Sequence, residues 1–193
     1  MRPLYALFAL LLIPAPLAAD TALRPQDRAR LDGFDASLGD AVMQALAGGA
    51  AQDVAALTQA LSGTPDIAFD PSLIGDWSCR TIKLGGISPL VVYTPFKCRI
   101  TASERGFALE KLSGSQRTKG EITLNDGRAI YVGVGYVAGE QPPAYGALPD
   151  NFASDGRVQA DVAVFQRISP TRARLLFPAP AVESDFDILE LTR

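Results

Sequence analysis

Hydrophobic and polar positions alternate along most of the chain from Gly75 to its end. The alternation comes in eight short runs rich in Val, Ile, Thr, Tyr and Phe, separated by Gly, Pro, Asn and Asp. This pattern is typical of β-strands joined by turns. We predict strands over residues 76–84, 90–101, 106–112, 119–125, 129–138, 158–168, 172–178 and 186–192.

Eight consecutive strands favour an up-and-down antiparallel barrel, because closure removes exposed sheet edges. A β-sandwich is the alternative. Asn125-Asp126-Gly127 predicts a hairpin turn. Gly133 and Gly135 share one face of the fifth strand, which indicates bending or a group packed close to the backbone. In the sixth strand, Ala160, Val162 and Val164 alternate with Asp161, which predicts a half-buried strand.

The segment before residue 62 has a helical pattern instead. Apolar residues recur at spacings of three and four, at Leu31, Phe34, Leu38, Val42 and Leu46. Gly48-Gly49 ends this stripe, and a second, shorter helix is predicted around Leu57. We expect a helical hairpin that packs on the main domain through its apolar stripe.

The first residues are typical of a bacterial secretory signal peptide. Arg2 precedes an apolar run over 4–13, and Leu17-Ala18-Ala19 follows two prolines. The run is shorter than the roughly 20 residues that a membrane span needs. We expect cleavage after Ala19 and export to the periplasm of a Gram-negative bacterium or beyond. The predicted organisation is signal peptide 1–19, helical hairpin 20–62, linker 63–74 and barrel 75–193.

Composition narrows the possible chemistry. The chain has 193 residues, no His, two Cys and a formal net charge of −3. Without His there is no Ser-His-Asp triad and no histidine-ligated metal, and two thiols cannot hold an iron–sulfur cluster. The mild acidic balance argues against a nucleic-acid partner. We predict no cofactor and no bound metal; the alternating acids Glu183, Asp185 and Asp187 are better explained as strand-flanking charges than as a calcium site.

Because the periplasm is oxidising, export predicts that Cys79 and Cys98 form a disulfide. The two cysteines lie in the first two predicted strands, and placing them opposite each other puts Trp77 near Ile100 and Thr81 near Phe96. Pro95 cannot donate a ladder hydrogen bond, so we expect a bulge or an edge at that residue.

The segment 139–157 has no periodicity and is unusually long for a loop without a function. Its apolar residues Tyr145, Leu148 and Phe152 are sufficient for it to pack as a lid. We therefore take this loop as the first candidate for a functional region.

Gly75-Asp76-Trp77, at the start of the first barrel strand, resembles the Gly-x-Trp signature of lipocalin-like barrels. The resemblance implies that Trp77 closes one end of the barrel beneath a basic residue near the last strand. Arg193 could fill that position.

A broader resemblance rests on four segments, Cys79–Gly86, Phe96–Ile100, Glu110–Arg117 and Glu183–Asp187, with Ala144-Tyr145-Gly146 between the last two. They are similar to the signature segments of a bacterial family known as domain of unknown function 4893, whose members are mostly secreted. The resemblance implies an architecture and no catalytic residues. Candidate binding residues from these segments and the long loop are Arg80, Lys83, Gln116, Arg117, Tyr145 and Phe152. The fork of Arg117 could hold a carboxylate or phosphate, although an ordinary surface ion pair is the commoner role of such a residue.

Three function classes remain open. The first is a binding module that holds a small apolar ligand in the barrel or beneath the loop 139–157. The second is a cell-envelope protein-interaction module, similar in layout to small barrels that inhibit proteases. The third, least favoured, is an enzyme, which would need carboxylates or a Ser-Lys pair such as Ser113 or Ser115 with Lys119.

Overall fold

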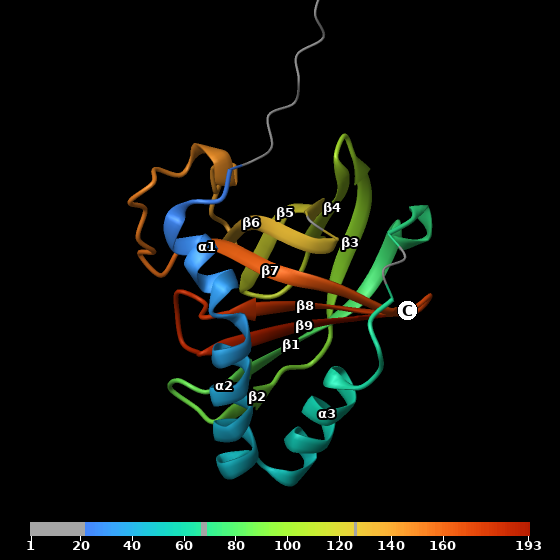
Figure 1. Cartoon of the computed structure of the whole chain (residues 1–193), viewed down its shortest axis with the longest axis vertical. Coiled ribbons are helices and arrows are strands. Elements are labelled where there is room, and N and C mark those ends of the chain that lie inside the picture. Colours follow the sequence, from blue (N-terminus) through green and yellow to red (C-terminus); the bar gives the residue numbers. More distant parts are fainter. Residues whose placement is uncertain (1–21, 67–68, 126) are drawn as a thin grey trace, which may run out of the picture.

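The chain folds into a closed antiparallel barrel with helices on its outer wall (Figure 1). A computed structural model describes residues 22–66, 69–125 and 127–193, so the predicted signal peptide and Asp126 lie outside the described residues. The barrel strands are β1 (Gly75–Leu84), β3 (Phe96–Ser103), β4 (Gly106–Lys111), β5 (Gln116–Asn125), β6 (Arg128–Val137), β7 (Val158–Ser169), β8 (Arg172–Pro178) and β9 (Phe186–Thr192). Each pairs with the next, and β9 pairs with β1, which confirms a barrel over a sandwich.

One predicted strand is split in two. Residues 90–101 form β2 (Leu90–Val92) and β3, which both pair with the same side of β1. Between them the chain leaves the ladder and includes Pro95, which has no N–H to donate. The interruption expected at this proline is therefore present.

The disulfide between Cys79 and Cys98 is confirmed, with 5.8 Å between the two Cα atoms. The predicted register was wrong by two residues, because Cys98 pairs with Trp77, and Cys79 pairs with Phe96. The bond thus joins diagonal neighbours, which strand twist can bring close together. A shift of two residues leaves every side chain on the same face, so alternation could not reveal it.

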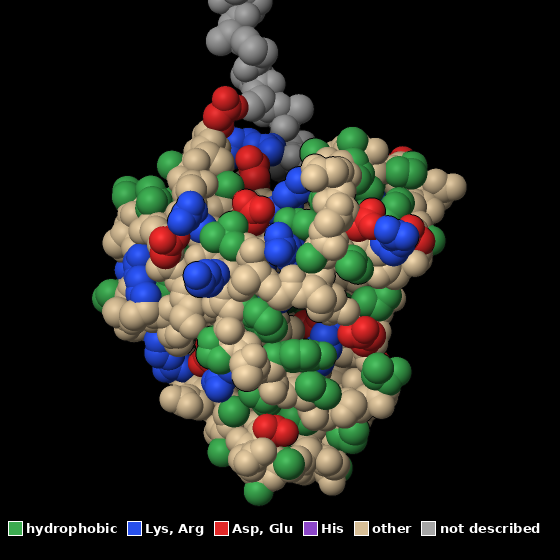
Figure 2. Space-filling model, turned by 180° about the vertical axis from the view of Figure 1, so that it is seen from behind, with side chains coloured by type: hydrophobic (Ala, Val, Ile, Leu, Met, Phe, Trp, Pro, Cys, Tyr) green, Lys and Arg blue, Asp and Glu red, His purple; other side chains and the backbone are tan. Residues whose placement is uncertain are grey.

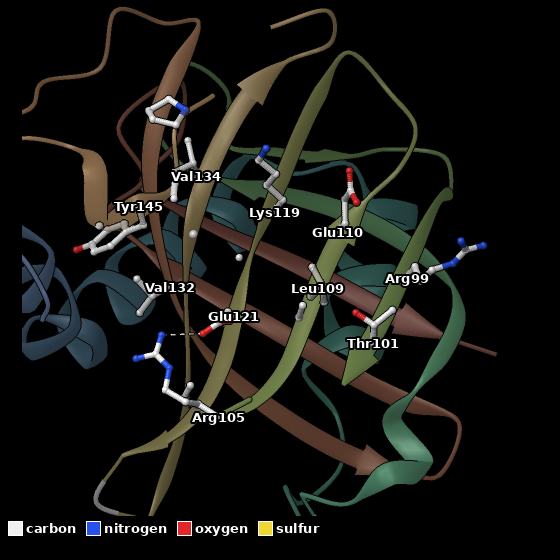
Figure 3. A pocket seen from close by; sticks show the side chains of 17 residues that line it. Arg99, Thr101, Arg105, Leu109, Glu110, Lys119, Glu121, Val132, Val134 and Tyr145 are labelled. Carbon is white, nitrogen blue, oxygen red and sulfur yellow. Dashed lines mark hydrogen bonds and ion pairs between the residues drawn. The ribbon is translucent and has the colours of Figure 1, made fainter. Parts of the chain in front are cut away.

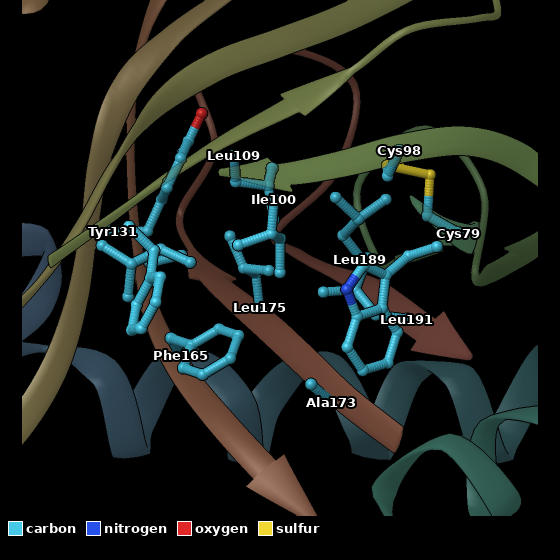
Figure 4. Packing of buried hydrophobic residues seen from close by; sticks show 14 of the residues in the cluster. Cys79, Cys98, Ile100, Leu109, Tyr131, Phe165, Ala173, Leu175, Leu189 and Leu191 are labelled. Carbon is cyan, nitrogen blue, oxygen red and sulfur yellow. A yellow bond between two sulfur atoms is a disulfide. The ribbon is translucent and has the colours of Figure 1, made fainter. Parts of the chain in front are cut away.

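Apolar side chains fill one half of the barrel, which we call the barrel base (Figure 4). The inward-facing residues of the barrel strands meet there in one buried cluster that includes Trp77, Ile100, Leu109, Ile122, Tyr131, Phe165, Leu175, Leu189 and Leu191. This packing gives no support to the expected apolar ligand inside the barrel, since a ligand at the base would have to displace these side chains.

Trp77 and Arg193 are in contact at the barrel base. The Arg193 guanidinium lies 3.9 Å from the Trp77 ring centroid, and it donates to the carbonyls of Ser72 and Ile74. Gly75 has φ +133°, and a Cβ on it would lie 3.3 Å from Arg193 Nη1. A glycine at this position therefore leaves room for the cation over the indole.

The predicted linker packs against the same end of the barrel. Asp66 forms a β-bridge with Arg167, and Asp70 Oδ2 lies 2.9 Å from Arg167 Nη1. Phe69 packs edge-on against Phe107, with ring centroids 4.7 Å apart. A short 3-10 helix, η1 (Pro71–Leu73), then leads into β1.

Among the described residues, three α-helices cover the outer wall: α1 (Pro25–Asp32), α2 (Phe34–Gly48) and α3 (Ala51–Leu61). In Figure 1, α1 and α2 run alongside the ends of β7, β8 and β9. The expected hairpin is formed by α2 and α3, while Gly33 divides the first predicted helix in two. No helix among the described residues is long and apolar enough to cross a membrane.

The apolar stripe of the helices packs on the barrel, as expected. Ala41 and Ala45 of α2 and Leu57 of α3 are buried in a cluster with Ile82 and Ile188 of the barrel wall. Leu46, predicted to belong to the stripe, is 52% exposed. The small side chains of the two alanines allow α2 to approach the sheet closely, which moves the contact face away from Leu46.

β7 is buried on both faces rather than one. Phe165 points into the barrel core, whereas Ala160 and Val162 point outward into a cluster with Tyr145 and Leu148 of the long loop. The loop and α1 therefore cover the face of β7 that would otherwise face solvent. This reverses the predicted half-buried strand and places Asp161 inside the barrel.

Candidate functional site

The segments that carry the family resemblance meet at the end of the barrel opposite Trp77, which we call the barrel mouth. Lys83 lies near the end of β1, Lys111 ends β4, Gln116 begins β5, and Asp187 lies at the start of β9. Because the strands are antiparallel, these ends all lie together. They surround a cavity of about 70 Å³ lined by Lys83, Lys111, Gln116, Arg117, Asp161 and Asp187, among others.

Lys83 forms the centre of an ion-pair cluster. Its Nζ lies 3.1 Å from Glu183 Oε2 and 3.4 Å from Asp187 Oδ2. Burial alone would lower the pKa of Lys83, but attraction to Asp187 and Glu183 outweighs burial and raises it. Burial raises the pKa of the Asp187 carboxyl, against the opposing effects of Lys83 and of a 2.6 Å hydrogen bond from Ser184.

Glu183 is held in an unusual backbone conformation, with φ 71°. The left-handed region is disfavoured for a residue with a Cβ and is often used at functional sites. Here it accompanies a carboxylate placed between Lys83 and the Gln116 amide, which donates to it at 3.2 Å. The Gln116 hydrogen bond and Lys83 lower the pKa of Glu183.

Lys111 is a second buried lysine at the barrel mouth, and its surroundings differ from those of Lys83. Its Nζ donates to the Gln116 carbonyl at 2.5 Å and lies 4.0 Å from the Phe96 ring centroid. Among the described residues, no carboxylate lies within ion-pair distance of it. Burial, followed by repulsion from Lys83 and Arg117, lowers the pKa of Lys111 to about 8.

Asp161 belongs to a hydrogen-bonded chain inside the barrel. Thr118 Oγ1 donates to Asp161 Oδ2 at 2.6 Å and lies 2.7 Å from the Tyr131 hydroxyl, and Gln159 donates to Asp161 Oδ1 at 3.0 Å. Burial raises the pKa of Asp161 to about 6. Strongly shifted pKa values are typical of functional sites.

The glycines of β6 make room for this chain. A Cβ on Gly133 would lie 2.5 Å from the Tyr131 hydroxyl, and one on Gly135 would lie 2.7 Å from Asp161 Oδ2. Of the two explanations that the sequence left open, close packing against the backbone is therefore present at both positions.

Asp161 makes stability depend on pH in a predictable direction. Its folded pKa of about 6 exceeds the usual 3.8, so the folded state binds the proton more tightly and stability falls as pH rises from about 4 to about 6. We expect Asp161→Asn to remove this loss and to be about 2 kcal/mol more stable than the wild type at pH 7.5, but not at pH 4. Urea unfolding at both pH values measures the difference. The exposed Asp150→Asn is the control, and a wild type that loses no stability over this range would contradict the assignment.

The candidate binding residues divide into two groups. Lys83, Gln116 and Arg117 meet at the barrel mouth. Arg80 instead points outward and pairs with Glu190, with Nη2 2.6 Å from Oε2. Its position directly opposite Glu190 in the β1–β9 ladder explains that pair.

Tyr145 and Phe152 lie on the outer wall beside β6 and β7 and do not line the cavity at the barrel mouth. The Tyr145 hydroxyl donates to Asp27 at 2.7 Å, and Asp27 also binds Arg24 and Arg30 of the α1 region. The Arg24 guanidinium lies over the Phe152 ring at 5.5 Å. These buried contacts tie the long loop to α1, so its apolar residues pack against the wall and not across the mouth.

The side chains considered from the sequence for a Ser-Lys pair or a calcium site do not come together in the fold. Ser113 Oγ accepts a hydrogen bond from the Lys97 backbone at 2.8 Å, while Lys119 points to the outer face, 5.7 Å from the Tyr136 ring centroid. Asp185 accepts from Gln44 and the Gly86 backbone, away from Lys83. Within the described ranges, no group of three or more acidic or thiol side chains could hold a metal ion.

Sequence reasoning missed Lys111, Thr118 and Asp161. Each lies at an inward position of its strand, where alternation expects an apolar side chain. The signal available in the sequence was a polar or charged residue at a position where the alternation of the strand places buried side chains. It was obscured in β7 because the outward positions of that strand are also apolar.

The outer wall carries a larger groove of about 510 Å³, beneath residues 143–146 (Figure 3). Arg99, Glu110 and Lys119 are neighbours across β3, β4 and β5, so their charges alternate along one row. Arg105 and Glu121 are paired directly, at 2.9 Å. The charges of this groove thus compensate each other. On the face in Figure 2, basic and acidic side chains are also interspersed.

Comparison with known proteins agrees with the resemblance seen in the sequence. A search of curated proteins finds no match. A family model described as "Domain of unknown function (DUF4893)" matches residues 20–191. Since the match covers nearly the whole chain, including every helix and, apart from Thr192, every strand described above, the protein belongs to the DUF4893 family.

Proposed function

We propose that this protein is an exported binding protein whose barrel mouth holds a small organic anion, such as a carboxylate or phosphate. The observation that carries the proposal is the environment of Lys111, a buried amine with cationic neighbours and no carboxylate within ion-pair distance among the described residues. A buried charge without a counter-ion is unfavourable by several kcal/mol. An anion in the adjoining cavity would offset that cost.

The size and lining of the cavity favour an anionic group over an apolar ligand. Its volume of about 70 Å³ suits a small polar group, and Arg117 supplies further positive charge at its wall, whereas Lys83 is paired with Glu183 and Asp187. The barrel base is already filled by side chains. Arg117 can present a two-pronged donor to a carboxylate or phosphate.

Export is supported by the predicted signal peptide at 1–19 and by the disulfide, since disulfides persist in oxidising compartments such as the periplasm. The helical stripe packs on the barrel, which argues against the interaction-module alternative. A binding role also needs no catalytic constellation, so we propose binding in preference to catalysis.

Thermal unfolding in the presence of small anions tests this proposal. We expect acetate, pyruvate or inorganic phosphate at about ten times its dissociation constant to raise Tm by roughly 3–6 °C, at low ionic strength. Lys111→Met keeps the apolar stem over Phe96 but removes the charge, so the shift should be lost.

Lys119→Met is the matched control, because Lys119 lies on the next strand but faces outward. Its variant should respond to the anion as the wild type does. If no anion raises the Tm of the wild type, or if Lys111→Met responds equally, the proposed function is wrong.

A further inference from the structure

We propose that Lys111 captures small carbonyl compounds covalently, as a Schiff base, and that its preferred partners are carbonyl compounds that also carry an anionic group. The inference rests on the proposed function in that both use the barrel mouth. It goes further because it assigns Lys111 a chemical reaction and narrows the ligand class.

Burial at this position makes the neutral amine more accessible than in an exposed lysine. The Lys111 Nζ is enclosed by the Phe96 ring, the Gln116 carbonyl and the tight turn at Gly114, where a Cβ would lie 3.1 Å from it. A neutral amine can donate a hydrogen to Gln116 and still keep its lone pair for attack. Desolvation and neighbouring cations activate lysine nucleophiles because they lower the pKa of the amine.

The charges around the amine come from several elements. The charged groups that line the same cavity or form ion pairs at its edge are Lys83 of β1, Arg117 of β5, Asp161 of β7, Asp187 of β9 and Glu183 of the β8–β9 connection. Two of the acids are engaged by Lys83. Burial, followed by repulsion from the two cations Lys83 and Arg117, lowers the pKa of Lys111 to about 8.

The reaction is a condensation that needs no oxidant or reductant. The amine lone pair attacks the carbonyl carbon and forms a C–N bond, while the carbonyl oxygen takes up a proton. The C–O bond of this carbinolamine then breaks, and the oxygen leaves as water with both protons that the amine originally carried. The product is an imine. Its formation is reversed by water unless the imine is reduced.

The anionic group gives the ligand its selectivity. Arg117 and Lys83 lie in the wall of the same cavity as Lys111, so an aldehyde or 2-oxo acid can place its carboxylate against them while its carbonyl reaches the amine. The volume of about 70 Å³ restricts the reacting part to a few non-hydrogen atoms. Glyoxylate, the smallest aldehyde acid, is therefore the probe.

Reductive trapping on the wild-type, disulfide-intact protein tests the inference. The protein is incubated with glyoxylate and cyanoborohydride at pH 7, and a peptide map measures modification at Lys83, Lys97, Lys111 and Lys119. At this pH an amine of pKa about 8 is neutral roughly one time in ten, and an ordinary lysine roughly one time in 2,500. We expect Lys111 to react at least about ten-fold faster than Lys97 and Lys119, allowing for its restricted access.

Acetaldehyde at the same concentration provides the second arm. The ratio of modification at Lys111 to that at Lys97 removes the intrinsic reactivity of each aldehyde, and we expect this ratio to be several-fold higher for glyoxylate. Equal ratios would overturn the preference for an anionic ligand. A Lys111 that reacts no faster than Lys97 with either aldehyde would overturn the capture itself.

The two proposals fail in distinguishable ways. Anions that raise Tm without any selective trapping at Lys111 would leave the binding function intact and reject the covalent step. Selective trapping without any Tm shift by acetate, pyruvate or phosphate would support the nucleophile and reject the anion-binding function.

Discussion

Trp77→Ala should lower the free energy of unfolding by about 3–5 kcal/mol, the range for truncating a large aromatic side chain in a core. Trp77 is 3% exposed and packs in the cluster that fills the barrel base. Its Nε1 donates to the Leu73 carbonyl at 2.9 Å, and Arg193 lies over its ring. The substitution therefore leaves a cavity, an unpaired buried carbonyl and a cation without its aromatic partner.

Urea unfolding followed by circular dichroism is the appropriate measurement, because Trp77 is the protein's single tryptophan and its removal abolishes the usual fluorescence signal. Trp77→Phe retains an aromatic face under Arg193 and should lose less than half as much stability. A Trp77→Ala variant within about 1 kcal/mol of the wild type would mean that the base is not the packed plug described above.

Loss of the disulfide should have the second largest effect, about 3 kcal/mol. The cysteines are 19 residues apart, so the bond closes a loop of moderate length and restricts the unfolded chain. The double substitution Cys79→Ala and Cys98→Ala removes the cross-link without placing a new polar group among the buried neighbours of the two side chains. Both cysteines are about 1% exposed, so replacement by serine would add an uncompensated burial cost.

The disulfide prediction is measured by urea unfolding of the oxidised wild type, the reduced wild type and the double variant. The reduced protein and the double variant should have similar midpoints, both below that of the oxidised protein. If reduction leaves the midpoint unchanged, the cross-link adds nothing to the stability of the β1–β3 hairpin.

Strand positions were predictable because each depends on a local pattern. The runs at 172–178 and 186–192 agree residue for residue with β8 and β9, and the break at Pro95 follows from its missing N–H. The cysteine pair follows because the chain has only two cysteines, and the contact between Trp77 and Arg193 is the one that the resemblance to Gly-x-Trp barrels implied.

Three features depended on contacts between distant segments and could not be predicted in the same way. The cysteines pair diagonally, β7 is covered on its outer face by α1 and the long loop, and Leu46 is left exposed by the close approach of Ala41 and Ala45. In each case the alternation or periodicity of the sequence fits more than one packing arrangement. Only the neighbouring element decides which arrangement forms.

By itself the sequence determined a strand-rich barrel with N-terminal helices, one disulfide, membership of one family and the absence of histidine chemistry. Only the tertiary structure decided where the site lies, because barrel closure brings the ends of β1, β4, β5, β7 and β9 together at the barrel mouth. The same closure removes water from Lys111 and Asp161 and shifts their pKa values toward neutrality. A charge pattern along the chain cannot reveal this, since burial depends on residues that are distant in sequence.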